Sequence, residues 1–351
     1  MSGEKGKFMR KILLVYNPVS GKDSERKDPD HIVRVFGRHG FEVTKTITTC
    51  TGDATRLVKE NLEGHEAIIC CGGDGTFSET VNGVMATGNR VPIMYLPSGS
   101  TNDFAATVGA SRSVEKQIDL YKKGYFNNYD IGTFNDNYFS YIASFGVASD
   151  SAYVTSQKFK NLLGHTAYVL ECFIFRLPHY IKTLRAYNMK IEYDGGVIED
   201  GFYFGAISNT NRVGGFFSYD KMDIKLNDGE FECLFVRGVR SVPDVFYLVK
   251  KIRDQNYDGG QIITFKTKHL KITCNDEVAW TFDGEFGGNH TNVDINVLPS
   301  AINIVSPPSD FFVTDKEPYD LEGKIFDDEI KKRKHEFKRK KDENKEDKVA
   351  E

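Results

Sequence analysis

The chain has 351 residues, 40% of them hydrophobic and 13% aromatic, the composition of an ordinary globular protein long enough for two domains. Its formal net charge of −4 gives no general bias toward nucleic acid, so no nucleic-acid partner is expected. The six cysteines have neither the density of a disulfide scaffold nor the spacing of a zinc site.

No run approaches the roughly 18 to 20 consecutive apolar residues that cross a bilayer, and the start "MSGEKGKFMRK" has no secretory apolar segment. We therefore expect a cytoplasmic protein. Any contact with the inner face of the membrane would be peripheral and not transmembrane.

Through about residue 125, short apolar runs alternate with helical patterns. The predicted strands are Lys11 to Tyr16, Glu42 to Ile47, Ala67 to Cys71 and Ile93 to Leu96. The predicted helices are Asp30 to His39, Asp53 to Glu60 and Phe77 to Met85. Strands that alternate with helices form parallel sheets through right-handed crossovers, so this part predicts an α/β domain.

After about residue 127 the sequence changes to β-branched and aromatic runs that glycines interrupt, such as "NYFSYIASFGVAS" and "GEFECLFVRG". This pattern is typical of antiparallel sheets, and it predicts a second, β-rich, sandwich-like domain from residue 128 to residue 300. Two helices are predicted within it, at Lys158 to Phe175 and at Pro243 to Ile252. A longer segment, Phe159 to Ile181, is rich in Leu, Phe and Tyr and would fit either a packed core helix or the lining of an acyl groove.

From residue 329 to residue 351 the chain is a charged tail, and eight of the eleven residues from Lys331 to Lys341 are Lys or Arg. Charge runs of this kind are usually solvated or disordered ends. The alternative is a segment at the membrane surface, because clustered cations are attracted to anionic lipid.

Each of the four predicted parallel strands ends in a loop rich in glycine and hydroxyl side chains. The loops are "NPVSGK" (17–22), "TTCTGDA" (48–54), "GGDGT" (72–76) and "PSGSTND" (97–103). Glycine lets the backbone approach a ligand closely, and the helix that follows attracts anions to its N-terminus. Each loop alone would also fit an ordinary turn or helix cap. Because all four would meet at one edge of the sheet, together they predict a polyphosphate-binding site.

Asp74 is the exception in these loops, since a carboxylate repels phosphate. A magnesium ion removes the conflict, because Mg²⁺ binds one or two carboxylates together with phosphate oxygens and waters. Asp74 is therefore predicted to lie beside Mg-ATP, as a direct or water-mediated partner of the metal. The alternative is a capping aspartate in a structural turn.

These residues resemble the diacylglycerol kinase catalytic family, in the bacterial soluble branch that is related to sphingosine and ceramide kinases. The shared segments are "NPVSGK", "GGDGT", "PSGSTNDFA" and a late "DGE" at residues 283–285, in the family's order. "GGDGT" alone also occurs in NAD kinases and phosphofructokinase-like proteins. The resemblance implies an active site between an α/β ATP-binding domain and a β-rich lipid-substrate domain, with residues from about 301 to 328 rejoining residues 1–127.

The resemblance also implies which residues act. Those expected to contact ATP are Asn17, Pro18, Ser20, Gly21, Lys22, Thr48, Gly73, Asp74, Gly75, Thr76, Phe77, Ser78, Glu79, Ser100 and Asn102. Ser100 stands where the family usually has threonine, and it keeps the hydroxyl. Glu285 is expected to be the base that accepts the proton of the acceptor hydroxyl, with Asp74 as its catalytic partner through the metal.

A second magnesium site, structural in kind, is implied at "KLNDGEF". The Asp228 carboxylate and the carbonyls of Lys225 and Glu230 would be its ligands, and Asp103 and Asp130 would join through water. From the sequence alone this segment is an Asp-Gly hairpin turn.

The sequence thus predicts an ATP- and Mg-dependent lipid kinase that phosphorylates a lipid hydroxyl at the membrane surface, with diacylglycerol as the acceptor. The resemblance further implies a homodimer. Two alternatives stay open at this point. One is an enzyme similar to NAD kinase with a soluble acceptor, and the other is a non-catalytic lipid- or nucleotide-binding regulator on the same fold.

Overall fold

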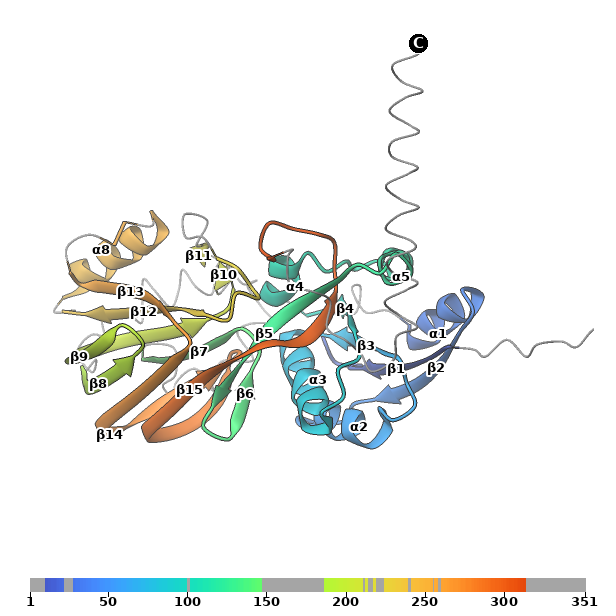
Figure 1. The fold of residues 1–351 in the computed structure, drawn as a ribbon, viewed down its shortest axis with the longest axis horizontal. Helices are drawn as coiled ribbons and strands as arrows, with labels where there is room; N and C mark the ends of the chain where they lie inside the picture. The colour runs from blue at the N-terminus through green and yellow to red at the C-terminus, as the bar shows by residue number, and fades with distance from the viewer. Residues whose placement is uncertain are drawn as a thin grey trace, which may run out of the picture.

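The computed structural model describes residues 10–21, 28–99, 102–146, 186–210, 212–213, 217–218, 224–238, 241–254, 256–257 and 260–313. Its first part alternates strands and helices (Figure 1). The strands are β1 (Arg10–Tyr16), β2 (Phe41–Ile47), β3 (Ala67–Gly72) and β4 (Ile93–Pro97). The helices are α1 (Pro29–Arg38), α2 (Asp53–Asn61), α3 (Asp74–Thr87), α4 (Asp103–Val108) and α5 (Val114–Lys122).

The first four strands pair in parallel, in the order β4-β3-β1-β2. Every residue of β3 and β4 is buried, as expected for strands that helices cover on both faces. One face of the sheet packs into a hydrophobic core through residues such as Leu13 and Val15, and the other face packs into a second core through Ile12 and Leu14. Because the strands run in one direction, their carboxyl ends meet at one edge of the sheet.

The second part is rich in strands. Before the undescribed segment 147–185 they are β5 (Phe126–Phe134), β6 (Asn137–Phe139) and β7 (Ile142–Gly146). After it come β8 (Tyr187–Tyr193), β9 (Gly196–Ser208), β10 (Arg212–Val213), β11 (Phe217–Ser218), β12 (Phe231–Arg237), β13 (Ile262–Thr267), β14 (His269–Phe282) and β15 (Glu285–Val305). A helix, α8 (Val242–Arg253), joins β12 to β13. The prediction of a mixed α/β fold with a sheet-rich part is thus confirmed.

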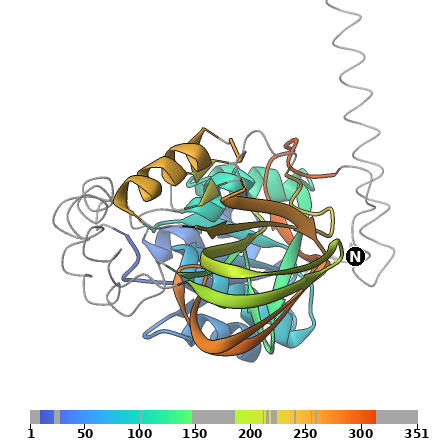
Figure 2. The same cartoon turned by 90° about the vertical axis from the view of Figure 1, so that its left-hand side faces the viewer.

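In the described part of the chain, the strands of both parts belong to one continuous sheet of thirteen strands, while β10 and β11 form a separate ribbon. The joining strand is β15, which pairs in parallel with β4 and antiparallel with β5 and β14. Figure 2 shows how the antiparallel strands curl at the end of the molecule. The boundaries predicted from the sequence, at 127/128 and 300/301, therefore fall inside β5 and β15, and the β15–β5 register shifts between Leu298 and Ile302.

One helix prediction needs correction, two helices were missed, and one predicted helix lies outside the described chain. The helix after β3 begins at Asp74 and not at Phe77, so the end of "GGDGT" forms its first turn. Helices α4 and α5 were not predicted at all. The predicted helix at Pro243 to Ile252 is confirmed as α8, whereas Lys158 to Phe175, the groove segment to Ile181 and the tail at 329–351 lie outside the described residues.

Candidate functional site

The loops at the carboxyl edge of the parallel sheet lie in direct contact with one another. Asn17 donates from Nδ2 to the Thr76 hydroxyl at 2.8 Å, and the hydroxyls of Ser20 and Ser98 are 2.6 Å apart. The side-chain oxygen of Asn17 also accepts the N–H of Val19, which folds the backbone into a tight turn around Pro18. The first, third and fourth loops therefore form one connected site. Lys22 and Ser100 lie outside the described residues.

Glycines are required where these loops touch. Gly21 has φ of +66°, and a Cβ there would lie 1.8 Å from the carbonyl oxygen of Ser98. A Cβ on Gly99 would lie 2.7 Å from the Cα of Gly73. Real Cβ atoms do not approach other atoms so closely, so side chains at these positions would push the loops apart.

The fourth loop is held by Asn102, which adopts a left-handed conformation with φ of 53° just before α4. Its side chain donates to the Gly99 carbonyl at 2.5 Å and accepts the Gly99 N–H at 2.9 Å. Asn102 is buried. The Asn102 side chain thus fixes the backbone at Gly99, which lies against Gly73 of the third loop.

Three more of the predicted ATP contacts have structural partners. Both carboxylate oxygens of Glu79 accept N–H groups at the start of α2, from Gly52 at 2.8 Å and from Ala54 at 3.1 Å. The Phe77 ring is buried and stacks on Phe104 with the ring centroids 4.1 Å apart. Thr48 is buried, and its N–H donates to the Tyr16 carbonyl at 2.9 Å. The side chains of Glu79 and Phe77 therefore hold the site together.

Acidic side chains gather behind the third loop. Burial, followed by the nearby Asp103 carboxylate, raises the pKa of Asp74 to about 6, and Asp283 adds to the effect. The backbone N–H of Asp103, in the first turn of α4, donates to the Asp74 carboxylate and opposes this increase. Carboxylates brought so close together repel one another, and a cation would relieve the repulsion.

The late "DGE" segment forms the turn between β14 and β15. Asp283 and Gly284 have φ of 50° and 88°, as in the two-residue turns that suit antiparallel hairpins. Phe282 pairs with Glu285 across this turn. A Cβ built on Gly75 would lie 3.9 Å from Oε1 of the exposed Glu285, so the hairpin places this carboxylate over the first turn of α3.

Asp283 was not predicted as a site residue, yet its carboxylate accepts four hydrogen bonds beside the site. Its carboxylate accepts the backbone N–H groups of Ser140 at 2.7 Å, Tyr141 at 2.9 Å and Ile142 at 3.1 Å. It also accepts the Ser78 hydroxyl at 2.7 Å. The carboxylate thus joins the hairpin to the start of β7 and to α3. The sequence signal was the Asp-Gly pair, which indicates the turn but not the partners.

The predicted structural magnesium site is only partly assembled. Asp130 binds two backbone segments directly. Its carboxylate accepts the N–H of Gly229 at 2.6 Å and the N–H of Ser300 at 2.5 Å. Asp228 accepts the Glu230 N–H at 3.1 Å, and its other oxygen lies 3.3 Å from the Lys266 ammonium.

Both oxygens of the Asp228 carboxylate therefore already meet donors, and Asp103 lies beside Asp74 instead. Within the described parts of the chain, no three His, Cys, Asp or Glu side chains are grouped so as to hold a metal ion. The predicted magnesium site of the Asp228 carboxylate and the carbonyls of Lys225 and Glu230 stays a prediction, and the Lys266 ammonium lies beside that carboxylate. At Asp74, phosphate oxygens and waters would have to complete the ligands of a cation.

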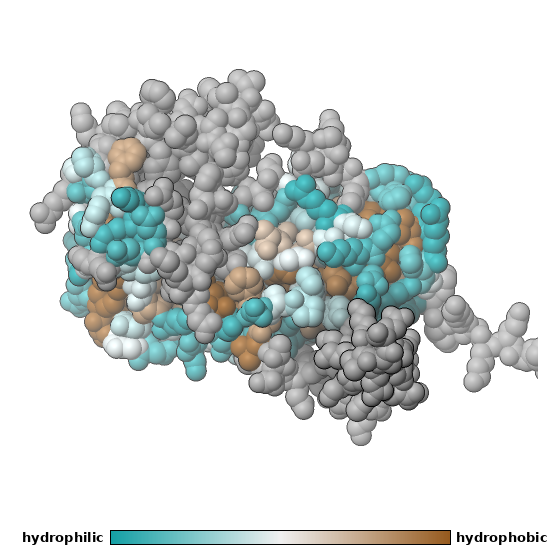
Figure 3. All heavy atoms as spheres, turned by 90° about the horizontal axis from the view of Figure 1, so that it is seen from above, coloured by the Kyte–Doolittle hydropathy of each residue, from teal (hydrophilic) through white to brown (hydrophobic). Residues whose placement is uncertain are grey.

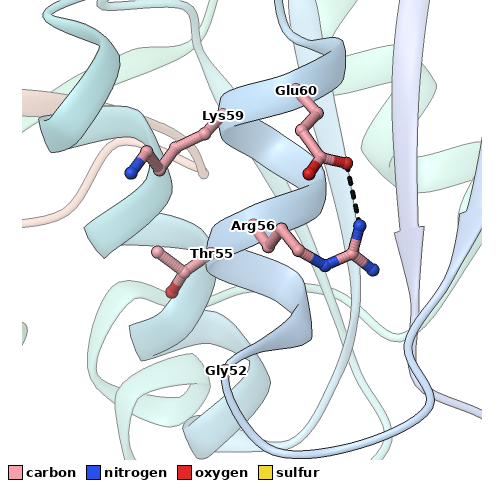
Figure 4. Close-up of a pocket in the computed structure, with 5 residues that line it drawn as sticks. All are labelled: Gly52, Thr55, Arg56, Lys59 and Glu60. Carbon is pink, nitrogen blue, oxygen red and sulfur yellow. Dashed lines mark hydrogen bonds and ion pairs between the residues drawn. The ribbon is translucent and has the colours of Figure 1, made fainter.

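A pocket of about 250 Å³ lies beside α2, lined by Gly52, Thr55, Arg56, Lys59 and Glu60 (Figure 4). Its Arg56 is held in an ion pair with Glu60 at 2.8 Å. Of these residues only Gly52 lies in a predicted loop (48–54), and none of the five is a predicted ATP contact or catalytic residue. The pocket is therefore not the candidate site, which is the arrangement of loops, Asp74 and Glu285 described above.

Comparisons with known proteins show which family the chain resembles. Residues 11–134 match the model of the diacylglycerol kinase catalytic domain. Over 303 residues, 85% of this chain and 97% of the relative, the chain is 32% identical to a diacylglycerol kinase of Bacillus subtilis (strain 168). It is 28% identical over 283 residues to a diacylglycerol kinase of Staphylococcus aureus (strain MRSA252), covering 80% of this chain and 87% of that one.

A solved structure has the same fold. The crystal structure of a diacylglycerol kinase from Bacillus anthracis strain Sterne superposes with a TM-score of 0.63 at 22% identity, covering 87% of this chain and 99% of that one. At that identity the likeness concerns the fold alone.

The matching family model and the relatives place the chain in a class of protein, the kinases that transfer phosphate to an alcohol. The chain belongs to the diacylglycerol kinase family and is a lipid kinase. Within the described residues, no helix is both long enough and apolar enough to cross a membrane.

Proposed function

We propose that the chain transfers the γ-phosphoryl group of ATP to the hydroxyl of diacylglycerol and thereby forms phosphatidic acid. The observation that supports this most directly is the position of Glu285, whose Oε1 lies 3.9 Å from a Cβ built on Gly75 in the first turn of α3. A base and a phosphate-binding helix N-terminus then face the same space. Relatives at 28 to 32% identity over most of the chain bear the name of this reaction.

In this proposal the phosphates lie on the loops that contain Gly21, Gly73 and Gly75. Their backbone N–H groups and the positive end of α3 would offset the phosphate charge. A magnesium ion beside Asp74, when bound, would neutralise negative charge on the phosphates. The acidic surroundings of Asp74 and Asp103 fit such a cation.

Glu285 would accept the proton of the lipid hydroxyl while that oxygen forms a bond to the γ-phosphorus and the bond to the leaving ADP oxygen breaks. Alignment and charge neutralisation account for most of phosphoryl-transfer catalysis. Glu285 contributes by orienting the hydroxyl and taking its proton. The hairpin that Asp283 fixes would hold it in place.

The remaining organisation is part of the same proposal. Residues 1–127 with about 301–328 would form the ATP-binding domain, and residues 128–300 the lipid-substrate domain. The protein would work as a homodimer in the cytoplasm, peripherally at the inner face of the membrane. The second magnesium site at Lys225, Asp228 and Glu230 stays a prediction, in which the ion would displace the Lys266 ammonium from the Asp228 carboxylate.

Gly21→Ala should weaken ATP binding without unfolding the protein. A Cβ at Gly21 would overlap the Ser98 carbonyl at 1.8 Å and force the two loops apart. Strain of this kind amounts to roughly 1 to 3 kcal/mol, so the affinity should fall by about tenfold or more. Titration calorimetry with Mg-ATP would measure it.

Gly88→Ala is a matched control. Gly88 has nearly the same φ, +67°, but nothing lies within 4 Å of its Cβ position. It should lower stability by about 1 kcal/mol and leave the ATP affinity unchanged. An equal loss of affinity in both variants would contradict the proposed loop contact.

An acceptor panel tests the proposed function. Purified protein with Mg-ATP should phosphorylate diacylglycerol in mixed micelles faster than sphingosine or ceramide, and should leave NAD unmodified. Chelation of Mg²⁺ with EDTA should abolish the transfer, and added Mg²⁺ should restore it. Transfer to NAD alone would favour the soluble-acceptor alternative, and ATP binding without any transfer would favour a regulator.

A further inference from the structure

Helix α8 has an exposed apolar and basic surface that the catalytic site does not use. Phe246 and Tyr247 are 49% and 50% exposed, although large rings are usually buried. The opposite side of the helix packs into the protein through Leu248, which is 4% exposed. The helix is thus amphipathic, with its two aromatic rings in the solvent.

Positive charges lie one turn along the same surface. Lys250 is exposed, and the Lys251 ammonium lies 5.0 Å from the centroid of the Tyr247 ring. The twelve residues of α8 include two lysines, one arginine and one aspartate, so the helix is positively charged in a chain of net charge −4.

The single acid of α8, Asp244, belongs to the N-terminal cap of the helix. Its carboxylate accepts the Ser241 N–H at 2.9 Å, as in a capping box. The exposed surface therefore combines aromatic rings with lysines, and its acid is engaged at the far end.

A series of contacts links helix α8, which carries this surface, to helix α4 at the candidate site. Helix α8 contacts β11, which pairs with β10, and β10 in turn contacts α4, whose first turn donates to Asp74. In Figure 1, α8, β10, β11 and α4 all lie along the upper side of the molecule, and Figure 3 looks down on that side. A flat partner that met α8 would approach the molecule from the side of α4.

We propose that the exposed face of α8, formed by Phe246, Tyr247, Lys250 and Lys251, docks the protein on an anionic lipid bilayer. Aromatic side chains enter the interface between headgroups and acyl chains, while lysines attract anionic headgroups. This proposal rests on the proposed function in one respect: a bilayer is chosen as the partner because the proposed lipid acceptor resides in it.

Vesicle sedimentation of the full chain tests the docking surface. The wild type should bind vesicles of phosphatidylcholine with phosphatidylglycerol more tightly than vesicles of phosphatidylcholine alone. F246S/Y247S and K250E/K251E should each weaken binding to the anionic vesicles by about tenfold or more. Phe246, Tyr247 and Lys250 are exposed and Lys251 is half-buried. If one double variant fails to fold, the other still decides the result.

The control variant V197S/K271E changes one exposed apolar residue and one exposed lysine on β9 and β14, and it should bind vesicles like the wild type. Transfer to a short-chain, water-soluble diacylglycerol should stay within about twofold in both α8 variants, because the catalytic residues are untouched.

Unchanged vesicle binding in both α8 variants would overturn the proposal. So would a change from dimer to monomer with vesicle binding intact, since α8 would then bind a second copy. A wild type that binds vesicles through α8 but phosphorylates no lipid would refute the proposed function and leave the docking surface standing.

Discussion

Replacing Glu285 by glutamine should lower the rate of lipid phosphorylation by between about a hundredfold and about ten-thousandfold. Glutamine has the same shape but cannot take the proton of the acceptor hydroxyl. The residue is exposed at the end of a hairpin, so the substitution should leave the free energy of unfolding within about 0.5 kcal/mol of the wild type. Initial rates with saturating Mg-ATP and diacylglycerol in mixed micelles would measure the loss.

ATP affinity separates a catalytic role from a binding role. The phosphate-binding loops are untouched in Glu285→Gln, so the dissociation constant for Mg-ATP should not change. The exposed Glu277, on the preceding strand, gives a matched control in Glu277→Gln, which should keep full activity. Wild-type activity in Glu285→Gln would remove the proposed base, and an equal loss of ATP binding would reassign it to nucleotide binding.

Replacing Asp283 by alanine should destabilise the protein by about 3 kcal/mol and also reduce activity. Its buried carboxylate accepts three backbone N–H groups, of residues 140–142, and the Ser78 hydroxyl. Alanine would leave the three N–H groups without a partner, and each unsatisfied buried group costs about 1 to 3 kcal/mol. Part of that cost is offset, because a buried carboxylate is itself desolvated, which raises the pKa of Asp283.

Urea denaturation measures the loss of stability. Kinase assays on the folded fraction measure the loss of activity that follows when the hairpin no longer holds Glu285 in position. Asp283→Asn should lie between alanine and wild type, because the amide keeps one oxygen that can accept N–H groups. Asp283→Ala with wild-type stability and activity would mean that the hairpin is held in place by other contacts.

The sequence predicted the parallel half of the molecule well because its signals there are local. Buried apolar runs such as Ile68 to Cys71 end in glycine loops, and the topology then brings these loops to one edge. The start of α3 was predicted too late because Gly73 and Gly75 suggest a loop. At a helix start, however, the first N–H groups have no intrahelical partner in any case, so glycine is tolerated there.

The side-chain roles that were missed depend on partners far away in the chain. Asp283 lies 141 to 143 residues from the N–H groups it accepts and 205 from Ser78. The capping of α2 by Glu79 joins segments 25 to 27 residues apart. No periodicity or motif reports such pairs. Helix α4 likewise has weak local signals, and its Phe104 is fixed by stacking on Phe77.

The pairing that joins the strands of both parts in one sheet could not be predicted from the sequence either. A change of composition near residue 127 indicated a boundary, yet β5 and β15 run through both predicted boundaries in one sheet. Strand β15 pairs antiparallel with β5 and β14 and, at Ile304, in parallel with β4, and such a strand has no distinct sequence pattern. Its only local mark is the left-handed Ser300, with φ of 52°, within the register shift.

The central claim is that this chain moves the γ-phosphate of ATP onto a lipid hydroxyl. Incubating the purified protein with γ-labelled ATP, Mg²⁺ and a total lipid extract, followed by chloroform extraction, tests it directly. We expect the label to enter the organic phase as a single lipid that comigrates with phosphatidic acid, and Glu285→Gln to form almost none. Label that stays wholly in the aqueous phase, with ATP still bound by the protein, would contradict it.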